Sequence, residues 1–297
     1  MELINKQKIE QLVQSLYLIV MNRAPDPGGA RYYEDLIERI GVDRAIPEML
    51  RAFLSSPEYS GRLDYRGLHV SPTLASYGTR LINGLPVNHV VSLGTHCQAS
   101  SVLKNGGLKK YSLPFDWLLS TPEIVLDCLA DDFANLLNQR YYQSIAFPNE
   151  SRADHTLYRD RYGLEAIFTH RDPSKEEHYA YLNRCVERFR RLLQSPDPKL
   201  FLMTSRSNVD LPGAFPKLVD ALLRVCSNFS LMGIHVLTPT GKPGIISMTP
   251  IIEGDHNLYA MHPSSREDAF AQFEDKLDEW TILRLIHCYK IALKDFA

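Results

Sequence analysis

The chain has 297 residues and a net charge of −2, which gives no global field that would recruit nucleic acid or an anionic membrane. No basic start with an apolar core marks a signal peptide, and no uncharged apolar run reaches the ~20 residues of a membrane helix. Five cysteines, an odd number without close pairs, favour reduced thiols, so the composition predicts a cytoplasmic protein without an integral membrane segment.

Residues 1–64 are predicted to form a small all-helical module. Apolar residues recur at helical spacing, and a Pro- and Gly-rich run at 23–29 breaks the first helix. Ser56 followed by Pro57 is typical of a helix start. Helices are expected near residues 9–20, 30–40 and 45–54.

One pattern in this module is Arg23, Asp26 and Gly29, followed by Ser56-Pro57-Glu58-Tyr59. It resembles a small helical bacterial module of unknown function that is often joined to surface-polysaccharide or secreted-protein machinery. A structural role explains these residues if Arg23 and Asp26 tie the turn to Glu58. Carbohydrate or protein-partner binding is the functional alternative.

Residues 65–88 are rich in Gly and Pro and are interpreted as a linker with one short helix near 74–82. The larger domain is expected to cover residues 89–297. Its strands are predicted at 90–93, 200–204, 232–237 and 245–248, and its helices at 98–104, 122–130, 178–193, 216–226 and 265–289. Strands separated by long helices predict an α/β fold of three layers, a mostly parallel sheet with flanking helices.

The most informative segment is the apolar run from Val90, which ends in Gly94 and leads through Cys97 into a helix. In open α/β sheets, ligands and catalytic groups collect at the carboxyl ends of strands. Backbone N–H groups and the helix dipole favour a thiolate at a helix start, so we expect a lowered pKa for Cys97. The alternative is a small buried cysteine in an ordinary turn.

Three blocks extend this pattern. They are Ser92-Leu93-Gly94-Thr95-His96-Cys97-Gln98, Ser112-Leu113-Pro114-Phe115-Asp116-Trp117 and Phe168-Thr169-His170-Arg171-Asp172. Together they resemble the signature of a bacterial family of papain-like cysteine peptidases, S-L-G-x-x-C-Q followed by P-F-D-W and F-x-H-x-D. The resemblance implies a thiol hydrolase or acyltransferase with Cys97 as the nucleophile. A buried strand leading into the cysteine disagrees with the papain architecture, so the α/β prediction stands.

A cysteine nucleophile needs a base within hydrogen-bond reach. His96 is a sequence neighbour that points away from Cys97, which suits contact with a ligand better than proton transfer. The resemblance implies His170 as the base. Asp172 would share a face with His170 in an extended segment, where its carboxylate could orient the imidazole. In the alternative, Asp172 caps the helix that begins after Pro173.

Four further residues are candidates for substrate binding together with His96. Phe115, Asp116 and Trp117 are expected to form one wall of the site, with the aromatic rings supplying apolar surface. Asp116 suits a buried hydrogen-bonding centre equally well. Arg206 follows a predicted strand and could bind a carboxylate or phosphate. The other four cysteines lie in helical, apolar patterns and are expected to pack in the core.

The chain has no dinucleotide fingerprint, Walker loop, G-x-S-x-G elbow, H-E-x-x-H or C-x-x-C spacing, so neither a cofactor nor a metal is predicted. The leading hypothesis is a thiol hydrolase or acyltransferase that acts on a peptide, an amide or an activated acyl group. One alternative is a transferase for a sugar or nucleotide-sugar in surface-glycan assembly. The other is a binding protein without turnover. A protein partner is conceivable through the helical module, whereas no nucleic acid is expected.

Overall fold

The computed structural model describes residues 6–21, 23–59, 78–148, 150–242, 244–268 and 271–295. The chain divides into two compact units, Met1–Tyr77 and Gly78–Ala297. Most of the predicted linker, up to residue 77, lies outside the described residues. Its described part forms turns and isolated bridges, not the end of a helix. The boundaries at 64 and 89 stay predictions.

The N-terminal unit is helical, as predicted. Its elements are α1 (Lys6–Leu16), the π-helical turn η1 (Tyr17–Met21), α2 (Pro27–Ile40) and α3 (Val42–Leu54). Apolar residues at helical spacing face the interior of this unit, where Val13 and Met49 are fully buried. Tyr17, Tyr33 and Phe53 pack edge to face in the same core.

The motif residues of this unit hold its turns together. Asp26 caps α2 by accepting the Gly29 N–H at 2.9 Å. Arg23 donates from Nε and Nη2 to both carboxylate oxygens of Glu58, at 2.7 and 2.9 Å. The hydroxyl of Ser56 accepts the Tyr59 N–H at 3.1 Å. The predicted structural role therefore accounts for the contacts of these residues.

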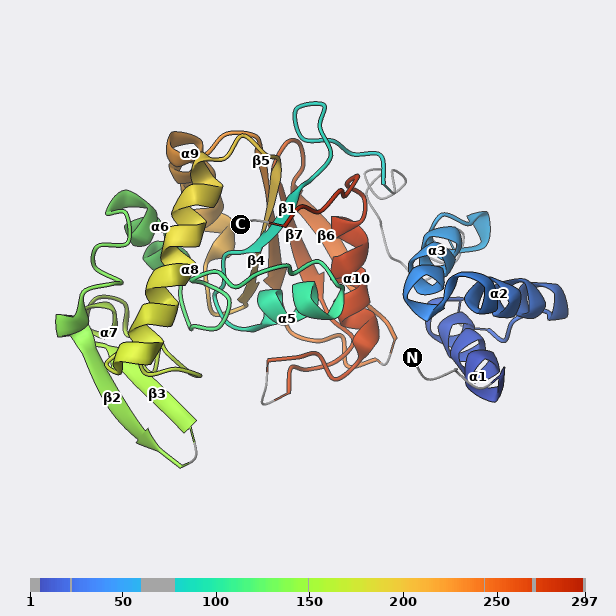
Figure 1. The fold of residues 1–297 in the computed structure, drawn as a ribbon, viewed down its shortest axis with the longest axis horizontal. Coiled ribbons are helices and arrows are strands. Elements are labelled where there is room, and N and C mark those ends of the chain that lie inside the picture. The colour runs from blue at the N-terminus through green and yellow to red at the C-terminus, as the bar shows by residue number, and fades with distance from the viewer. Residues whose placement is uncertain are drawn as a thin grey trace. The chain divides into compact units, whose positions relative to one another are not determined.

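A five-stranded sheet forms the centre of the larger unit, in the order β1-β4-β5-β7-β6 (Figure 1). The parallel strands are β1 (His89–Ser92), β4 (Lys199–Arg206), β5 (Phe229–Val236) and β7 (Asn257–His262), and β6 (Ser247–Ile252) pairs antiparallel with β7. The helical connection from β4 to β5 places these strands side by side and parallel, as such crossovers require. The predicted α/β fold with a mostly parallel sheet is confirmed.

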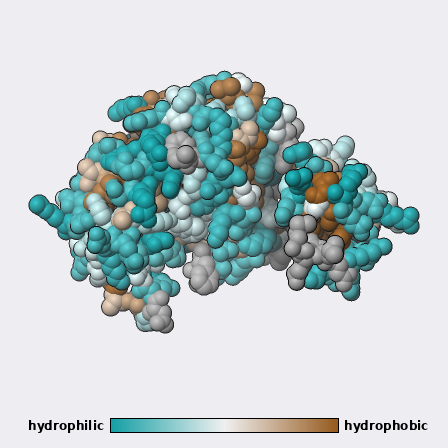
Figure 2. Space-filling model, in the orientation of Figure 1, coloured by the Kyte–Doolittle hydropathy of each residue, from teal (hydrophilic) through white to brown (hydrophobic). Residues whose placement is uncertain are grey.

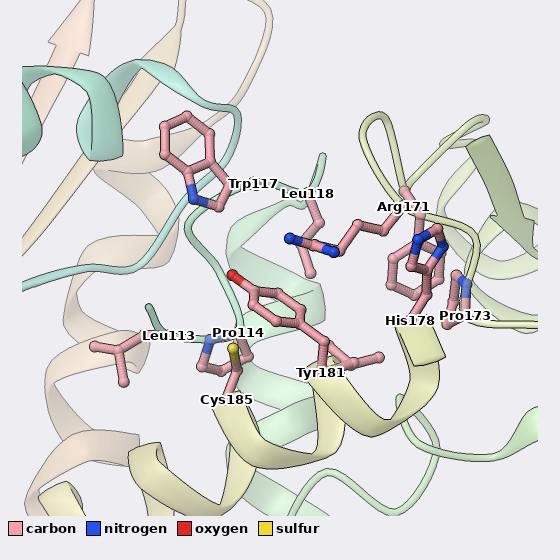
Figure 3. Close-up of a pocket in the computed structure, with 11 residues that line it drawn as sticks. Leu113, Pro114, Trp117, Leu118, Arg171, Pro173, His178, Tyr181 and Cys185 are labelled. Atoms are coloured by element: carbon pink, nitrogen blue, oxygen red, sulfur yellow. The ribbon is translucent and has the colours of Figure 1, made fainter. Parts of the chain in front are cut away.

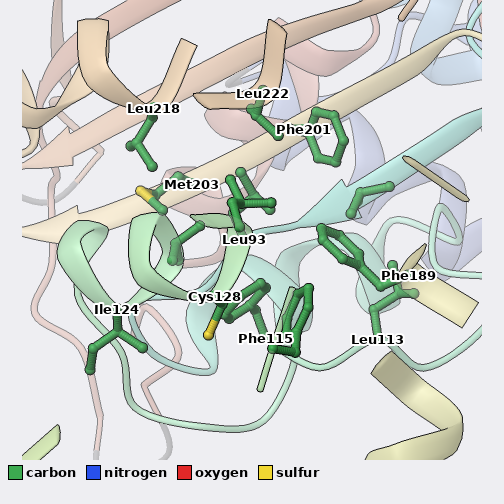
Figure 4. Close-up of a cluster of buried hydrophobic side chains, with 14 of the residues drawn as sticks. Leu93, Leu113, Phe115, Ile124, Cys128, Phe189, Phe201, Met203, Leu218 and Leu222 are labelled. Atoms are coloured by element: carbon green, nitrogen blue, oxygen red, sulfur yellow. The ribbon is translucent and has the colours of Figure 1, made fainter. Parts of the chain in front are cut away.

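Helices cover both faces of the sheet. They are α5 (Gln98–Asn105), α6 (Pro122–Ala130), α7 (Thr156–Tyr162), α8 (Glu176–Gln194), α9 (Leu211–Val225), α10 (Lys276–Ile286) and the short turn η3 (Gln139–Tyr141). One core cluster joins α6, α8 and α9 to the strands, with Phe201 and Met203 of β4 against Phe189 and Leu218 (Figure 4). Buried residues of α5 and α10 lie outside that cluster and cover the other face.

A two-stranded hairpin stands apart from the main sheet and was not predicted. It consists of β2 (Tyr142–Phe147) and β3 (Glu150–His155). The outer edge of β3 bridges Phe168, with Ala153 and Phe168 exchanging N–H···O bonds of 3.1 and 3.0 Å. The hairpin therefore fixes the segment that leads into His170.

The predicted helix at 265–289 is wrong over its first part, because α10 begins at Lys276. Asp275 caps α10 by accepting the Leu277 N–H at 2.9 Å. Ser264 and Ser265 direct their backbone N–H groups to the buried carboxylate of Asp278, at 2.6 and 2.9 Å. These bonds stabilise an irregular loop between β7 and α10.

Hydrophilic residues dominate the face of the molecule shown in Figure 2, with apolar residues in small separate patches. Such scattered apolar exposure is usual for folded domains and marks no docking surface by itself. Within the described ranges, no helix combines the length and apolar character needed to cross a bilayer.

Candidate active site

Cys97 lies where β1 ends and α5 begins. The pairing of β1 with β4 continues to Leu93, whose N–H donates to Leu202 O at 2.9 Å. The hydroxyl of Thr95 then donates to Thr204 O at 2.9 Å and ties the turn to the next strand. The Ser101 N–H donates to Cys97 O at 2.9 Å and starts the helix. The thiol thus stands at the carboxyl edge of the sheet, where the sequence places it.

The turn before Cys97 depends on Gly94. Its φ of +79° is left-handed, a region that side chains with a Cβ disfavour. A Cβ there would lie 2.8 Å from Ser120 Oγ and 3.1 Å from Phe115 O. The backbone of the Pro-Phe-Asp-Trp block therefore packs directly against this turn.

We expect Gly94→Ala to lower the free energy of unfolding by about 1–3 kcal/mol, the usual cost of a strained left-handed residue, with the close contacts adding to it. Urea unfolding measures this loss. Gly163→Ala is the matched control, because Gly163 has a φ of +66° and open space around a Cβ. An equal loss in both variants would contradict a contribution from the contacts.

The structure brings His170 to Cys97 across 73 residues of sequence. The distance from Cys97 Sγ to His170 Nε2 is 3.5 Å, within hydrogen-bond reach for sulfur. The ring of Trp117 packs edge to face on the imidazole with 6.1 Å between centroids. Thr169 donates its hydroxyl to Trp117 O at 3.4 Å, so the two segments are joined beside the pair.

Both members of this pair are neutral near neutral pH. Burial raises the pKa of Cys97 and outweighs the hydrogen bonds from Thr169 and its own backbone N–H, as well as the charge of Arg206. Burial likewise lowers the pKa of His170. The expected lowered thiol pKa is therefore wrong, because desolvation exceeds the effect of the helix start. The Sγ–H can donate to an unprotonated Nε2.

Asp172 makes its hydrogen bonds away from the imidazole. Its carboxylate accepts Ser144 Oγ–H at 2.7 Å and Ser174 Oγ–H at 2.6 Å, and its N–H donates to His178 Nδ1 at 3.0 Å. Among the described residues, no hydrogen bond joins this carboxylate to His170. The contacts suit the alternative in which Asp172 holds the turn before α8, and an orienting role stays a prediction.

The Pro-Phe-Asp-Trp block divides between core and site. Phe115 is fully buried, with its ring centroid 5.8 Å from those of Phe133 and Phe189, so it does not form the predicted wall. Its neighbour Asp116 is also buried, where it pairs with Lys109 and accepts the Leu113 N–H at 2.6 Å. Trp117 lines a small pocket, and its role as a wall of the site stays a prediction.

That pocket has a volume of about 40 Å³ and is mainly apolar (Figure 3). Trp117 and Arg171, the neighbour of His170, are among its lining residues. The guanidinium of Arg171 stacks 3.7 Å from the ring centroid of Tyr181. A cavity of this size holds only a small group.

His96 and Arg206 are joined by a residue that the sequence analysis missed. His96 is buried, and its Nε2 lies 3.1 Å from Glu267 Oε1. Arg206 donates from Nε to Glu267 Oε2 at 2.8 Å, while its side chain remains 51% exposed. Glu267 lies in the region predicted as helix, so no local pattern pointed to it. His96 thus faces a protein carboxylate, and Arg206 keeps a solvent-exposed side.

A larger pocket, of about 180 Å³, lies at the opposite edge of the sheet, near the amino ends of β5 and β7. Arg80, His256 and Tyr289 contribute to its lining. Because ligands of open α/β sheets bind at the carboxyl ends of the strands, the Cys97 edge is the better candidate. Over the described residues, no three His, Cys, Asp or Glu side chains gather as metal ligands.

The fold and the site define an α/β domain with a cysteine–histidine pair at the carboxyl edge of its sheet. Residues 88–231 match the family described as "Putative papain-like cysteine peptidase (DUF1796)", and residues 4–63 match "Domain of unknown function (DUF4214)". The larger unit therefore contains a segment similar to the first family and the N-terminal unit a segment similar to the second, which confirms both resemblances. No curated protein and no solved structure gives a significant match.

Proposed function

We propose that this protein is a thiol hydrolase or acyltransferase in which Cys97 is the nucleophile and His170 the general base. The observation that carries the proposal is the 3.5 Å separation of Cys97 Sγ and His170 Nε2. The family description supports the same chemistry at the level of a class. The four other cysteines are buried, and the sulfurs of Cys128, Cys226 and Cys288 face a tyrosine hydroxyl or backbone carbonyls instead of an imidazole.

The reaction begins with a neutral pair. Cys97 Sγ attacks the acyl carbon while the thiol proton moves to His170 Nε2, and a tetrahedral oxyanion forms. The collapsing intermediate expels the amine or alcohol, which takes that proton, and a thioester remains on Cys97. Water or an acceptor then attacks the thioester, gives its proton to His170 and releases the acyl product. The proton returns to the departing sulfur, so the pair is regenerated.

The start of α5 supplies donors for the oxyanion. The first N–H groups of a helix have no partner within the helix, and the dipole adds positive potential there. Cys97 is the N-cap residue of α5, so the N–H groups that follow it lie beside the reacting sulfur. Preorganised backbone donors of this kind stabilise the charge that develops on the carbonyl oxygen.

The surroundings of the pair suggest features of the substrate. The small apolar pocket beside Trp117 suits a small apolar group of the acyl portion. The exposed side of Arg206 suits a carboxylate or phosphate. Asp172 would act at a distance from the chemistry, by fixing the turn that follows His170.

The pH profile of Cys97 alkylation by iodoacetamide, followed by mass spectrometry against the other four cysteines, tests the pair. Because the pKa of His170 is lowered and that of Cys97 is raised, both groups are neutral over a pH range that begins below about 6.5 and ends above about 8.5. Within it, a minor thiolate–imidazolium form has a pH-independent population. We therefore expect a plateau, with a fall at lower pH where His170 is protonated and a rise at higher pH where the free thiolate forms.

His170→Ala is expected to abolish the plateau and leave only the rise at high pH. His262→Ala is the control, because its Nδ1–H donates to Thr238 O at 2.8 Å and not to Cys97. Superimposable profiles of the wild type and His170→Ala would overturn the pairing. Cys97 would then be a turn residue, and binding of nucleotide-sugars would be tested next.

A further inference from the structure

Four side chains from distant segments form a polar cluster beside Cys97, which we call the Glu267 cluster: His96, Gln98, Arg206 and Glu267. Oε1 of Glu267 accepts from Gln98 Nε2 at 2.6 Å and lies 3.1 Å from His96 Nε2. Oε2 accepts from Arg206 Nε at 2.8 Å and Nη2 at 2.6 Å. The carboxylate therefore has four donors, and its side chain is only 13% exposed.

Both ring nitrogens of His96 have hydrogen-bond partners. Nδ1 lies 2.9 Å from the hydroxyl oxygen of Thr95, which itself donates to Thr204 O. The Glu267 carboxylate accepts from Nε2–H. Burial opposes the charge of Glu267, but the hydrogen bonds and charges of His96 and Arg206 outweigh it and lower the pKa of that carboxyl. The cluster thus joins the Glu267 carboxylate to the Arg206 guanidinium and to the imidazole of His96.

The loop that carries Glu267 is anchored to α10. Its first residues bind the carboxylate of Asp278, which accepts the Ser264 N–H at 2.6 Å and the Ser265 Oγ–H at 2.7 Å. Asp275 closes the loop by donating its N–H to Ser265 Oγ at 2.8 Å. Asp278 itself is fully buried. Glu267 therefore reaches the neighbours of Cys97 from a segment whose described residues are anchored on both sides of it.

The cluster acts on both sides of the nucleophile. His96 precedes Cys97 and Gln98 follows it, so a single carboxylate holds the residues that flank the sulfur. Arg206, on the neighbouring strand, is the cation whose charge reaches the thiol. Removing the carboxylate would leave His96 and Gln98, on either side of Cys97, without their shared acceptor and the guanidinium of Arg206 without its anion.

We propose that Glu267 is a positioning residue for the Cys97 site, which fixes the turn around the nucleophile and holds the cation of Arg206 beside it. This role rests on the proposed function of the cysteine–histidine pair. Glu267 lies outside residues 88–231, so the site would extend beyond the segment that matches the peptidase family. The loop before α10 would then be part of the active site.

The test compares the alkylation profiles of folded Glu267→Gln and Glu267→Asp with that of the wild type. Glu267→Gln removes the charge and keeps the shape, whereas Glu267→Asp keeps the charge and withdraws it by one methylene. Both are expected to lower the plateau rate of Cys97 by about tenfold or more, since a displacement of about 1 Å can reduce rates about 100-fold. Glu274→Gln, an exposed residue of the same loop with the same charge change, should keep the wild-type plateau.

A second readout is independent of alkylation. In ¹⁵N–¹H spectra of the histidine side chains, the Nε2 resonance of His96, which is hydrogen-bonded to Glu267, should be the same in the wild type and in Glu274→Gln and should shift in Glu267→Gln. Wild-type profiles in both folded Glu267 variants would overturn the positioning role alone. Absence of a His170-dependent plateau in the wild type itself would overturn the proposed function and, with it, this role.

Discussion

The Cys97→Ala variant should lose turnover by about 10⁴-fold or more once a substrate has been found, because deletion of a nucleophile leaves only binding and oxyanion stabilisation. The free energy of unfolding should change by no more than about 1 kcal/mol, since the Cys97 sulfur lies beside His170 and outside the hydrophobic core cluster. A panel of fluorogenic peptides, amides and activated esters measures the turnover, and urea unfolding measures the stability.

Cys128→Ala is the matched control for this prediction. Cys128 is fully buried in the core cluster, with its sulfur 3.5 Å from the Tyr158 hydroxyl. We expect this variant to lose stability and to keep turnover per folded molecule. If Cys97→Ala retained turnover or lost several kcal/mol of stability, Cys97 would be a packing residue.

The Asp116→Ala variant should lose about 3–5 kcal/mol of stability, the usual result of breaking a buried ion pair from one side. Asp116 is 1% exposed and pairs with Lys109, whose ammonium also lies 5.8 Å from the Trp117 ring centroid. The variant leaves that ammonium without its anion and the Leu113 N–H without its acceptor. Thermal and urea unfolding at neutral pH measure the loss.

The shifted pKa of Asp116 determines whether its contribution to stability rises or falls with pH. Burial raises the pKa of Asp116, although Lys109 and the Leu113 N–H counter the shift. A carboxyl whose pKa is higher in the folded than in the unfolded state stabilises the fold most at pH values below its ordinary pKa of about 3.9. This stabilisation is lost as the pH rises through the folded-state pKa. Lys109→Met removes the main counter-charge, so its stability should fall more steeply with rising pH than that of the wild type.

A double-mutant cycle completes the test of the buried pair. Lys109→Met combined with Asp116→Leu replaces both charges with apolar groups and should recover most of the loss seen in either single variant. Purely additive losses would contradict a coupled pair. The cycle also separates the structural role of Asp116 from a role in substrate binding, since no substrate is present.

The alternation of apolar runs with helical segments predicted the parallel strands β1, β4 and β5 and the position of Cys97, whereas the parallel strand β7 was not predicted. Burial on both faces makes β1 and β4 continuous apolar runs, which are visible without any tertiary information. The hairpin of β2 and β3 was missed because β2 is largely exposed and lacks an apolar alternation. The first part of the α10 region was overpredicted because the helical composition continues across a loop held by Asp278.

The sequence by itself determined the α/β class, because the class depends on the periodicity of apolar residues. It also pointed to Cys97 at the end of a strand and to His170 as the candidate base, because each lies in a short contiguous motif. Only the tertiary structure decided that Sγ and Nε2 lie 3.5 Å apart, that Phe115 belongs to the core and that Glu267 joins the site. Such features arise from contacts between residues far apart along the chain. The direction of the pKa shift of Cys97 also depends on tertiary structure. Burial by residues far away in the sequence raises this pKa more than the helix start lowers it.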